Sequence, residues 1–238
     1  MKQKKLVLFD IDGTLIRPLA GGKALHRFSY AIKIAYGVEI QLDEHRWGEH
    51  YNGKGDWWII EDLTKNAGLS KETIRAGLDR VGQAFCKYLE NLSRGGRIYE
   101  TIDDAKKLVA AVVAAPHLTA SVLTGNLGAS AVWKLTHAGY NEFYEIGIFG
   151  HEAEDRVKLA KLVQPKVKKH LGYDVRAEDI IIIGDTVHDI ICARAIGAVA
   201  IAVTSGWKVD KDALIKAKPD LLVDSLMDGR VLTLLGLK

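Results

Sequence analysis

The sequence predicts an α/β protein built on a doubly wound parallel sheet, with a second, all-helical segment inserted into it. Short apolar runs alternate with helical patterns over much of the chain, which is typical of parallel strands joined by helices. The runs IIII at 180–183 and VAIAV at 199–203 show no polar alternation, as expected for strands covered on both faces. Residues 18 to about 96 break this order and carry helical patterns only.

The expected strands of this Rossmann-like core are short and spread along the chain. They span residues 5–9, 120–123, 145–149, 180–183, 199–203 and 221–223. The helices expected between them span residues 103–115, 129–138, 156–171 and 188–195. In such sheets, ligands bind in the crevice beyond the carboxyl ends of the strands. Residues that directly follow the strands are therefore the first candidates for a functional site.

The helical segment follows the first strand. Apolar residues recur with helical spacing over residues 21–37, 56–68 and 72–92. Breakers at Arg17-Pro18 and around Gly95-Gly96 mark plausible hinges. The sequence therefore predicts two domains: a core of residues 1–16 and 97–238, and an α-helical insert of residues 17–96.

Composition excludes several classes of protein. Hydrophobic residues make up 48% of the chain and charged residues 26%, which is ordinary for a soluble globular protein. A net charge of +3 suits small anionic ligands, and the Lys-rich run 158–169 has the apolar stripe of a solvated helix face rather than a nucleic-acid footprint. No signal peptide and no apolar run of about 18 residues is evident. Cys86 and Cys192 form no metal or redox motif. We expect a cytoplasmic protein that binds neither nucleic acid nor membranes.

Acidic residues stand where an apolar strand should end. The stretch LVLFDIDGTLI at 6–16 places Asp10 and Asp12 directly after the first strand, and IIIIGDTVHD at 180–189 places Asp185 and Asp189 after another. In a parallel sheet these groups meet at one edge. Two carboxylates about 4 Å apart repel by roughly 4 kcal/mol at an effective dielectric near 20, so the cluster opposes folding unless a cation offsets it. Oxygen-rich sites that face an anionic substrate favour Mg²⁺.

Three motifs carry a family resemblance. DIDGT at 10–14, LTGN at 123–126 and GDTVHD at 184–189, in this order and with helices inserted after the first, resemble the haloacid dehalogenase superfamily. They are most similar to its phosphatase branch with a helical cap, in particular to phosphoglycolate phosphatase-like members. The resemblance covers nearly the whole chain and implies a Mg²⁺-dependent phosphatase of small phosphorylated metabolites.

The resemblance implies roles for the motif residues. Asp10 would attack phosphorus and form an aspartyl-phosphate, while Asp12 would act as general acid and then as general base. Thr124, with Gly125 and Asn126, would hold the phosphoryl oxygens. The metal ligands would be Asp10, the carbonyl of Asp12 and Asp185, with Asp189 as a further candidate from the same motif.

Two cation assignments are less specific. The family's third motif supplies a Lys or Arg that pairs with the nucleophile and the phosphate, and here HEAEDRVKLAK at 151–161 offers Arg156, Lys158 and Lys161. An Asp-Arg pair in similar proteins favours Arg156, while spacing equally permits Lys158. In the helical insert, NGKGD at 52–56 resembles a substrate-facing loop, in which Lys54 would bind a carboxylate or phosphate of the substrate.

The same motif residues are compatible with other functions. A sugar-phosphate mutase, similar to β-phosphoglucomutase, would use the same carboxylates and return the phosphoryl group to a sugar. A dehalogenase would leave Asp12 without a role, and a phosphonate hydrolase would need a cap lysine in a convincing motif. A non-catalytic binding protein on the same fold would have no reason to keep clustered carboxylates. The expected partner is a small phosphorylated metabolite, and the chain would act as a monomer or homodimer.

Overall fold

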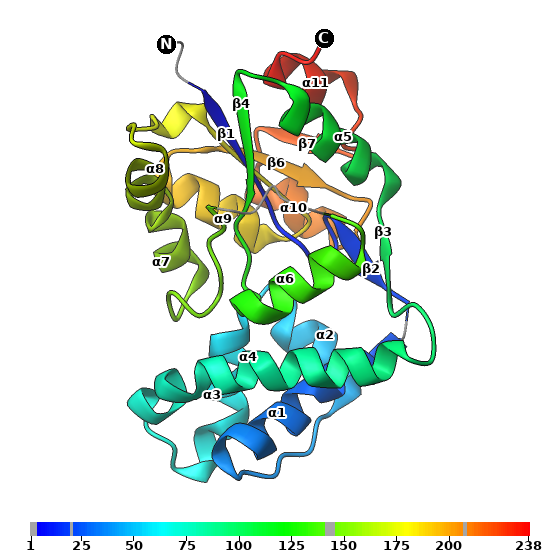
Figure 1. Cartoon of the computed structure of the whole chain (residues 1–238). Coiled ribbons are helices and arrows are strands. Elements are labelled where there is room, and N and C mark those ends of the chain that lie inside the picture. Colours follow the sequence, from blue (N-terminus) through cyan, green and yellow to red (C-terminus); the bar gives the residue numbers. More distant parts are fainter. Residues whose placement is uncertain (1–3, 20, 141–145, 207–208) are drawn as a thin grey trace.

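A computed structural model describes residues 4–19, 21–140, 146–206 and 209–238 of the chain. Its centre is a five-stranded, all-parallel sheet with the strand order β4-β1-β5-β6-β7 (Figure 1). The strands are β1 (Lys5–Phe9), β4 (Leu118–Val122), β5 (Ile180–Gly184), β6 (Val199–Val203) and β7 (Leu221–Val223). The predicted α/β fold with a parallel sheet is confirmed.

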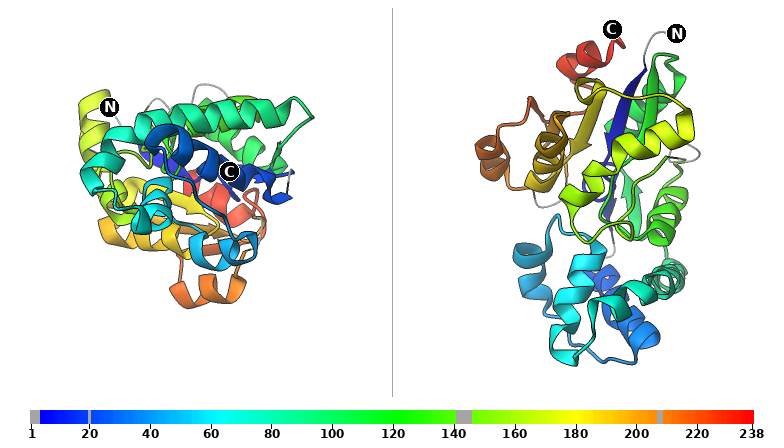
Figure 2. Two further views of the ribbon diagram at one scale, coloured as in Figure 1. Left: turned by 90° about the horizontal axis from the view of Figure 1, so that it is seen from below. Right: turned by 90° about the vertical axis from the view of Figure 1, so that its left-hand side faces the viewer.

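Helices cover both faces of this sheet, as Figure 2 shows. Because neighbouring side chains on a strand point to opposite faces, Val7 and Phe9 of β1 join one hydrophobic core while Leu6 and Leu8 join the other. The first core is shared with α5 (Asp103–Ala114), α6 (Gly128–His137) and α11 (Gly229–Leu235). The second is shared with α7 (Arg156–Lys161), α8 (Val163–Leu171), α9 (Val187–Ile196) and α10 (Lys211–Ala217). No helix among the described residues has both the length and the apolar character needed to cross a membrane.

Two predicted elements differ in the structure. The helix expected over 156–171 is divided into α7 and α8 at Leu162, because Pro165 has no N–H to donate to the carbonyl four residues earlier. The strand expected over 145–149 is reduced to a single parallel bridge between Ile148 and Leu123. Glu145 lies outside the described residues. The chain turns away after Phe149, where the Gly150 N–H donates to the Asn126 carbonyl at 2.7 Å.

The inserted segment consists of helices between two very short strands. Its helices are η1 (Gly21–His26), α1 (Arg27–Tyr36), α2 (Glu44–Tyr51), α3 (Asp56–Thr64), η2 (Lys65–Ala67) and α4 (Lys71–Ser93). They have a hydrophobic core of their own, which includes Phe28, Ile60 and Phe85. The strands β2 (Ile16–Pro18) and β3 (Tyr99–Thr101) pair antiparallel and connect the helices to the sheet, and the sequence did not predict them. Figure 1 shows these helices beyond the end of the sheet toward which β1 runs.

Candidate active site

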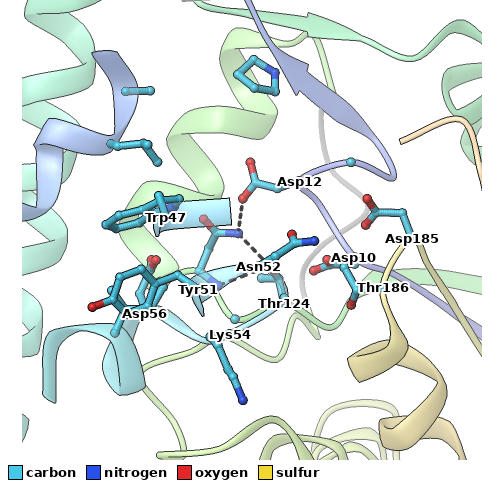
Figure 3. Close-up of a pocket in the computed structure, with 18 of the residues that line it drawn as sticks. Asp10, Asp12, Trp47, Tyr51, Asn52, Lys54, Asp56, Thr124, Asp185 and Thr186 are labelled. Atoms are coloured by element: carbon cyan, nitrogen blue, oxygen red, sulfur yellow. Dashed lines mark hydrogen bonds between the residues drawn. The ribbon is translucent and has the colours of Figure 1, made fainter. Parts of the chain in front are cut away.

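The register of the sheet brings three loops together. Phe9, the last residue of β1, pairs with Val122 of β4 on one side and with Ile183 of β5 on the other. The three strands therefore end level, and their next polar residues, Asp10, Thr124 and Asp185, lie at one edge of the sheet. All three are at least 95% buried, since their exposed fractions are 5%, 0% and 5%. Figure 3 shows their side chains around one pocket.

Three buried carboxylates form the most acidic part of this pocket. One oxygen each of Asp10, Asp185 and Asp189 lies within 4.8 Å of the others. Burial, together with the charges of Asp189 and Asp12, raises the pKa of Asp10 to about 7, although the Arg156 guanidinium opposes the shift. Burial and the neighbouring carboxylates Asp189 and Asp10 also raise the pKa of Asp185 well above its usual value. The cluster therefore resists ionisation on its own.

The cluster fits a bound divalent cation. The Oδ1 atom of Asp185 is buried and has no hydrogen-bond partner among the described residues. An unpartnered buried carboxylate oxygen costs free energy unless a cation or a donor reaches it. Asp189 is different, because its Oδ2 accepts hydrogen bonds from the backbone and hydroxyl of Thr186, while its Oδ1 pairs with Arg156. Of the three carboxylates, those of Asp10 and Asp185 are therefore the most available to bind a metal ion.

Arg156 is the cation that reaches the acidic cluster. It begins α7, is 8% exposed, and its Nη2 atom pairs with Asp189 and lies 3.6 Å from an oxygen of Asp10. Burial by itself would lower the pKa of Arg156, but Asp189 and Asp10 outweigh it and raise that pKa. Lys158, two residues later, points elsewhere: its side chain is 55% exposed and pairs with Glu154 and Asp155. The structure therefore brings Arg156, and not Lys158, to the pocket.

Asp12 has surroundings quite unlike those of Asp10. Lys134 of α6 contacts both of its carboxylate oxygens, at 2.9 and 2.7 Å, and Asn126 donates to one of them at 2.8 Å. Burial alone would raise the pKa of Asp12, but Lys134, Asn126 and the more distant Arg27 lower it overall. The side chain of Asp12 is turned away from the acidic cluster, so its carbonyl is the only part that could serve as the predicted metal ligand.

Asn126 joins the second motif to Asp12. Its amide nitrogen donates to Asp12 and to the hydroxyl of Thr124, and its amide oxygen accepts from Lys134 at 2.7 Å. Thr124 accepts this bond through its oxygen, which leaves its own O–H group as a donor. The hydroxyl of Thr124 is therefore oriented by Asn126 and can donate to a phosphoryl oxygen.

Glycines allow the motif loops to approach each other closely. Gly13 has φ +85°, which other residues rarely adopt, and a Cβ atom there would collide with the carboxylate of Asp185. A Cβ on Gly184 would collide with Asp189 in the same way. The Gly13 N–H donates to the carbonyl of Ile16 at 2.8 Å, which closes the turn after Asp12. The glycines of the first and fourth motifs are thus required by the packing of the carboxylates.

The helical insert supplies the opposite wall of the pocket. The cavity has a volume of about 400 Å³ and is lined on this side by Trp47, Tyr51, Asp56 and Arg27, among others. The Asp56 N–H donates to the Gly125 carbonyl at 2.8 Å, and its carboxylate accepts from the Leu127 N–H at 2.9 Å. A Cβ on Gly125 would lie only 2.7 Å from the Cα of Gly55. These contacts hold the insert directly against the loop of the second motif.

Most of the predicted site residues are brought together, and some are not. Asp10, Asp12, Thr124, Gly125, Asn126, Arg156, Asp185 and Lys54 all line the cavity. Asp189 does not line the cavity but pairs with Arg156, which does. The ammonium group of Lys54 is directed away from Asp10 and Asp12 in Figure 3 and lies 5.0 Å from the ring centre of Trp58. Lys158 lies outside this cavity.

The structure also gives roles to residues for which the motifs indicated none. Lys134 is 1% exposed, and Asp56 and Arg27 are 4% and 8% exposed. Lys134 shares the buried face of α6 with Ala131 and Leu135, so a lysine in an apolar helical register was the available signal. No role for Arg27 could be read from the sequence, because its ion pair with Asp56 joins two different helices of the insert.

The fold and the site together indicate the class of protein. The motif loops follow the strands of a parallel sheet and meet beneath a helical insert. A family model described as HAD-like hydrolase matches residues 158–229, which include the fourth motif. The chain has the Rossmann-like fold of the haloacid dehalogenase superfamily, and the resemblance indicated by its three motifs is confirmed.

Solved structures share this fold over nearly the full chain. CbbY from Rhodobacter sphaeroides, in complex with phosphate, is 18% identical with a TM-score of 0.71, covering 98% of this chain and 100% of its own. A protein of Haemophilus somnus, described as a predicted phosphoglycolate phosphatase, is 21% identical with a TM-score of 0.63, covering 98% and 99%. A proposed β-phosphoglucomutase of Bacteroides vulgatus is 17% identical with a TM-score of 0.63, covering 98% and 89%. No curated protein sequence matches the chain.

Proposed function

We propose that this protein is a Mg²⁺-dependent phosphoric monoester hydrolase that acts on small phosphorylated metabolites through an aspartyl-phosphate at Asp10. One observation carries the proposal. Asp10, Asp185 and Asp189 come from separate segments, yet their oxygens lie within 4.8 Å, and Asp185 Oδ1 has no hydrogen-bond partner in the described part of the chain. The shared fold with phosphoglycolate phosphatase-like proteins supports the same reaction class.

Asp10 and Asp185, with the carbonyl of Asp12, would hold the magnesium ion. When bound, Mg²⁺ neutralises the repulsion between the nucleophile and the phosphate and helps to orient both. Arg156 lies 3.6 Å from Asp10 and would contribute positive charge on the same side. Phosphoryl transfer requires positive charge beside the phosphate, and the metal ion and the fixed side chain of Arg156 would supply it.

In the first step, a carboxylate oxygen of Asp10 attacks phosphorus while the bond from phosphorus to the ester oxygen breaks. The departing alkoxide takes a proton from Asp12, and the alcohol leaves. Lys134 keeps Asp12 ionised in this structure, because it lowers the pKa of that group. A phosphate dianion beside Asp12 would raise its pKa and so favour uptake of the proton that the leaving group needs.

In the second step, Asp12 accepts a proton from water, and the water oxygen attacks phosphorus of the aspartyl-phosphate. The bond between phosphorus and the Asp10 oxygen breaks, which releases inorganic phosphate and restores the carboxylate. In both steps the hydroxyl group of Thr124 would donate a hydrogen bond to a phosphoryl oxygen, since its own oxygen already accepts one from Asn126. The net reaction consumes one water and yields an alcohol and phosphate.

Phosphate release from a generic aryl phosphate, with and without Mg²⁺, tests the proposal. The wild-type chain is expected to be active only with the metal, and Asp10→Asn is expected to be inactive. The matched control is Lys158→Ala, which removes a cation two residues from Arg156 but outside the pocket. Full activity of Asp10→Asn would contradict the assignment of the nucleophile, and no release from a broad panel of phosphate esters would favour a non-catalytic binding protein.

A sugar-phosphate mutase is the second candidate, because a proposed β-phosphoglucomutase shares the fold. Such an enzyme would use Asp10 and Asp12 in the same way but would pass the phosphoryl group to a sugar hydroxyl. Product analysis with a hexose 1-phosphate separates the two functions. Free phosphate and sugar indicate the hydrolase, whereas a hexose 6-phosphate indicates the mutase.

A further inference from the structure

The cavity is larger than a short phosphorylated acid requires. Its volume of about 400 Å³ falls within the range of roughly 300–1,000 Å³ that holds drug-sized ligands. The phosphoryl group would occupy only the edge formed by Asp10, Thr124 and Arg156. The remaining space lies toward the helical insert, where the alcohol part of the substrate must be bound.

Two aromatic side chains form the wall of this remaining space. Trp47 and Tyr51 lie one turn apart on α2, and their ring centres are 4.6 Å apart. The ring of Phe28, from α1, lies 5.1 Å behind Trp47 and supports it. Both rings are only partly buried and line the cavity. In Figure 3 they lie on the opposite side of the view from Asp10 and Asp185. A ring-shaped ligand could stack on Trp47 and Tyr51 without displacing side chains from the hydrophobic core of the insert.

The positive charges around the cavity already have carboxylate partners. Arg27 lies 3.6 Å from Asp56, donates to the Ala24 carbonyl, and stacks 4.5 Å from the centre of the Phe28 ring. Lys134 is bound by Asp12, and Arg156 by Asp10 and Asp189. Each pair neutralises its cation before a substrate arrives.

Lys54 is the exception among the cavity's described cations, since no described carboxylate pairs with it. Its ammonium group, however, lies over Trp58 and is directed away from the acidic cluster in Figure 3. Arg27 and Asp56 lie 3.6 Å apart, so a second anionic group bound beside Arg27 would also lie near the Asp56 carboxylate. Three of the four described cations that line the cavity are thus already paired with carboxylates, which weakens their attraction for a second anionic group on the substrate.

We propose, on the basis of the phosphatase function above, that the alcohol part of the substrate is an uncharged ring whose apolar face lies on Trp47 and Tyr51. Both a pyranose and an aromatic ring present such a face. A phosphorylated two-carbon acid is a poor substrate, because it leaves the aromatic wall in water and adds an unpaired negative charge. Trp47 and Tyr51 are accordingly the specificity-determining residues of the site.

A matched set of phosphate esters tests ring preference and charge preference separately. Steady-state kinetics would compare ethyl phosphate with benzyl phosphate, and phosphoglycolate with 4-carboxybenzyl phosphate, all with Mg²⁺. Aromatic contacts of this kind predict a KM about fivefold to tenfold lower for benzyl than for ethyl phosphate. Each carboxylated ester is expected to have a higher KM than its neutral counterpart. Glucose 6-phosphate with a KM below that of benzyl phosphate would identify a pyranose, and the reverse order an aromatic ring.

Variants of the aromatic wall locate the effect. Trp47→Leu is expected to raise KM for benzyl phosphate about fivefold with kcat little changed, and to raise KM for ethyl phosphate by a clearly smaller factor, because leucine keeps the packing on Phe28 but offers no ring to the ligand. Trp47→Phe should restore most of the ring preference. Equal KM values for ethyl and benzyl phosphate, or a KM lowest for phosphoglycolate, would overturn the proposed substrate class.

A binding measurement keeps this proposal separate from the proposed reaction. Calorimetry with benzylphosphonate and ethylphosphonate, which contain no hydrolysable ester bond, reports ring binding even if no ester is turned over. Tighter binding of benzylphosphonate, lost in Trp47→Leu, would support the ring site in a protein that hydrolyses nothing. Equal binding of the two phosphonates would refute it in an active phosphatase.

Discussion

The two walls of the pocket differ in how they are held and in what they can recognise. On the sheet side, Asp10, Thr124 and Asp185 follow three strands that end level, so the backbone register fixes their positions. On the insert side, Trp47 and Tyr51 stand on a short helix and are positioned by side-chain packing. The first arrangement suits a reaction that tolerates little displacement. The second suits recognition of the alcohol part of the substrate, because Trp47 and Tyr51 can be replaced without disturbing the sheet.

A similar contrast exists within the sheet side. Asp10 and Asp12 are two residues apart, yet burial and neighbouring carboxylates raise the pKa of Asp10 while Lys134 and Asn126 lower that of Asp12. Groups of one chemical type with pKa values shifted in opposite directions are typical of acid–base sites. The difference comes from the partners that α6 and α7 bring to each carboxylate.

The largest effect is expected for a variant of the sheet side, and it would distinguish catalysis on that side from binding on the insert side. Asp10→Asn should lower kcat by about 10³-fold or more, since it removes the nucleophile. The variant should melt no lower than the wild type, because it relieves repulsion within the acidic cluster. Kinetics with an aryl phosphate and thermal unfolding check both statements. A large KM effect with kcat preserved would mean that Asp10 belongs, like Trp47, to binding alone.

The next effect concerns the cation of the sheet side. Arg156→Ala should destabilise the protein by about 3 kcal/mol or more, because it leaves Asp10 and Asp189 buried without their partner. Urea unfolding measures the change. Lys158→Ala should leave the unfolding midpoint unchanged, since that side chain is exposed. Equal destabilisation by the two variants would show that Arg156 does not hold the acidic cluster together.

A smaller effect is expected at the pair of Lys134 and Asp12. Lys134→Met keeps the volume of the side chain and should cost about 1 kcal/mol at pH 7, a modest figure because water partly screens Asp12. The folded state lowers the pKa of Asp12, so the pair stabilises the protein above the unfolded pKa of about 3.9. That contribution is lost as the pH falls through the lower, folded pKa. Unfolding at pH 7 and at pH 3 should therefore differ less in the variant than in the wild type.

The smallest effect is the pH dependence of metal stabilisation. The folded pKa of Asp10 is about 7, above its unfolded value, so this group favours the folded state at low pH and progressively less as the pH rises toward 7. Protons and Mg²⁺ compete for the same oxygens. Added Mg²⁺ should raise the melting temperature by a few degrees more at pH 8 than at pH 6. Asp185→Asn should abolish most of this shift. A pH-independent shift would place the metal elsewhere.

Sequence reasoning predicted the sheet side better than the insert side, for a physical reason. A motif that follows a strand is placed by local register, so Asp10, Thr124 and Asp185 could be assigned without knowledge of distant contacts. The helix α2, which carries Trp47 and Tyr51, is short and mostly polar, and it was not predicted. The strand expected over 145–149 did not form as such, because among its described residues, 146–149, only Ile148 forms a bridge to another segment, at Leu123. Apolar content alone does not show whether a neighbouring strand edge is available.

By itself, the sequence determined the parallel sheet and the motif residues at its carboxyl edge, because both follow from local patterns, while the reaction class was implied by the resemblance of those motifs to a family. Only the tertiary structure decided between Arg156 and Lys158, which point to different sides of α7 since residues two apart on a helix do not share a face. It also decided that Lys134 pairs with Asp12 and that Trp47 faces the cavity. These choices depend on contacts between segments far apart in the chain, which no local pattern encodes.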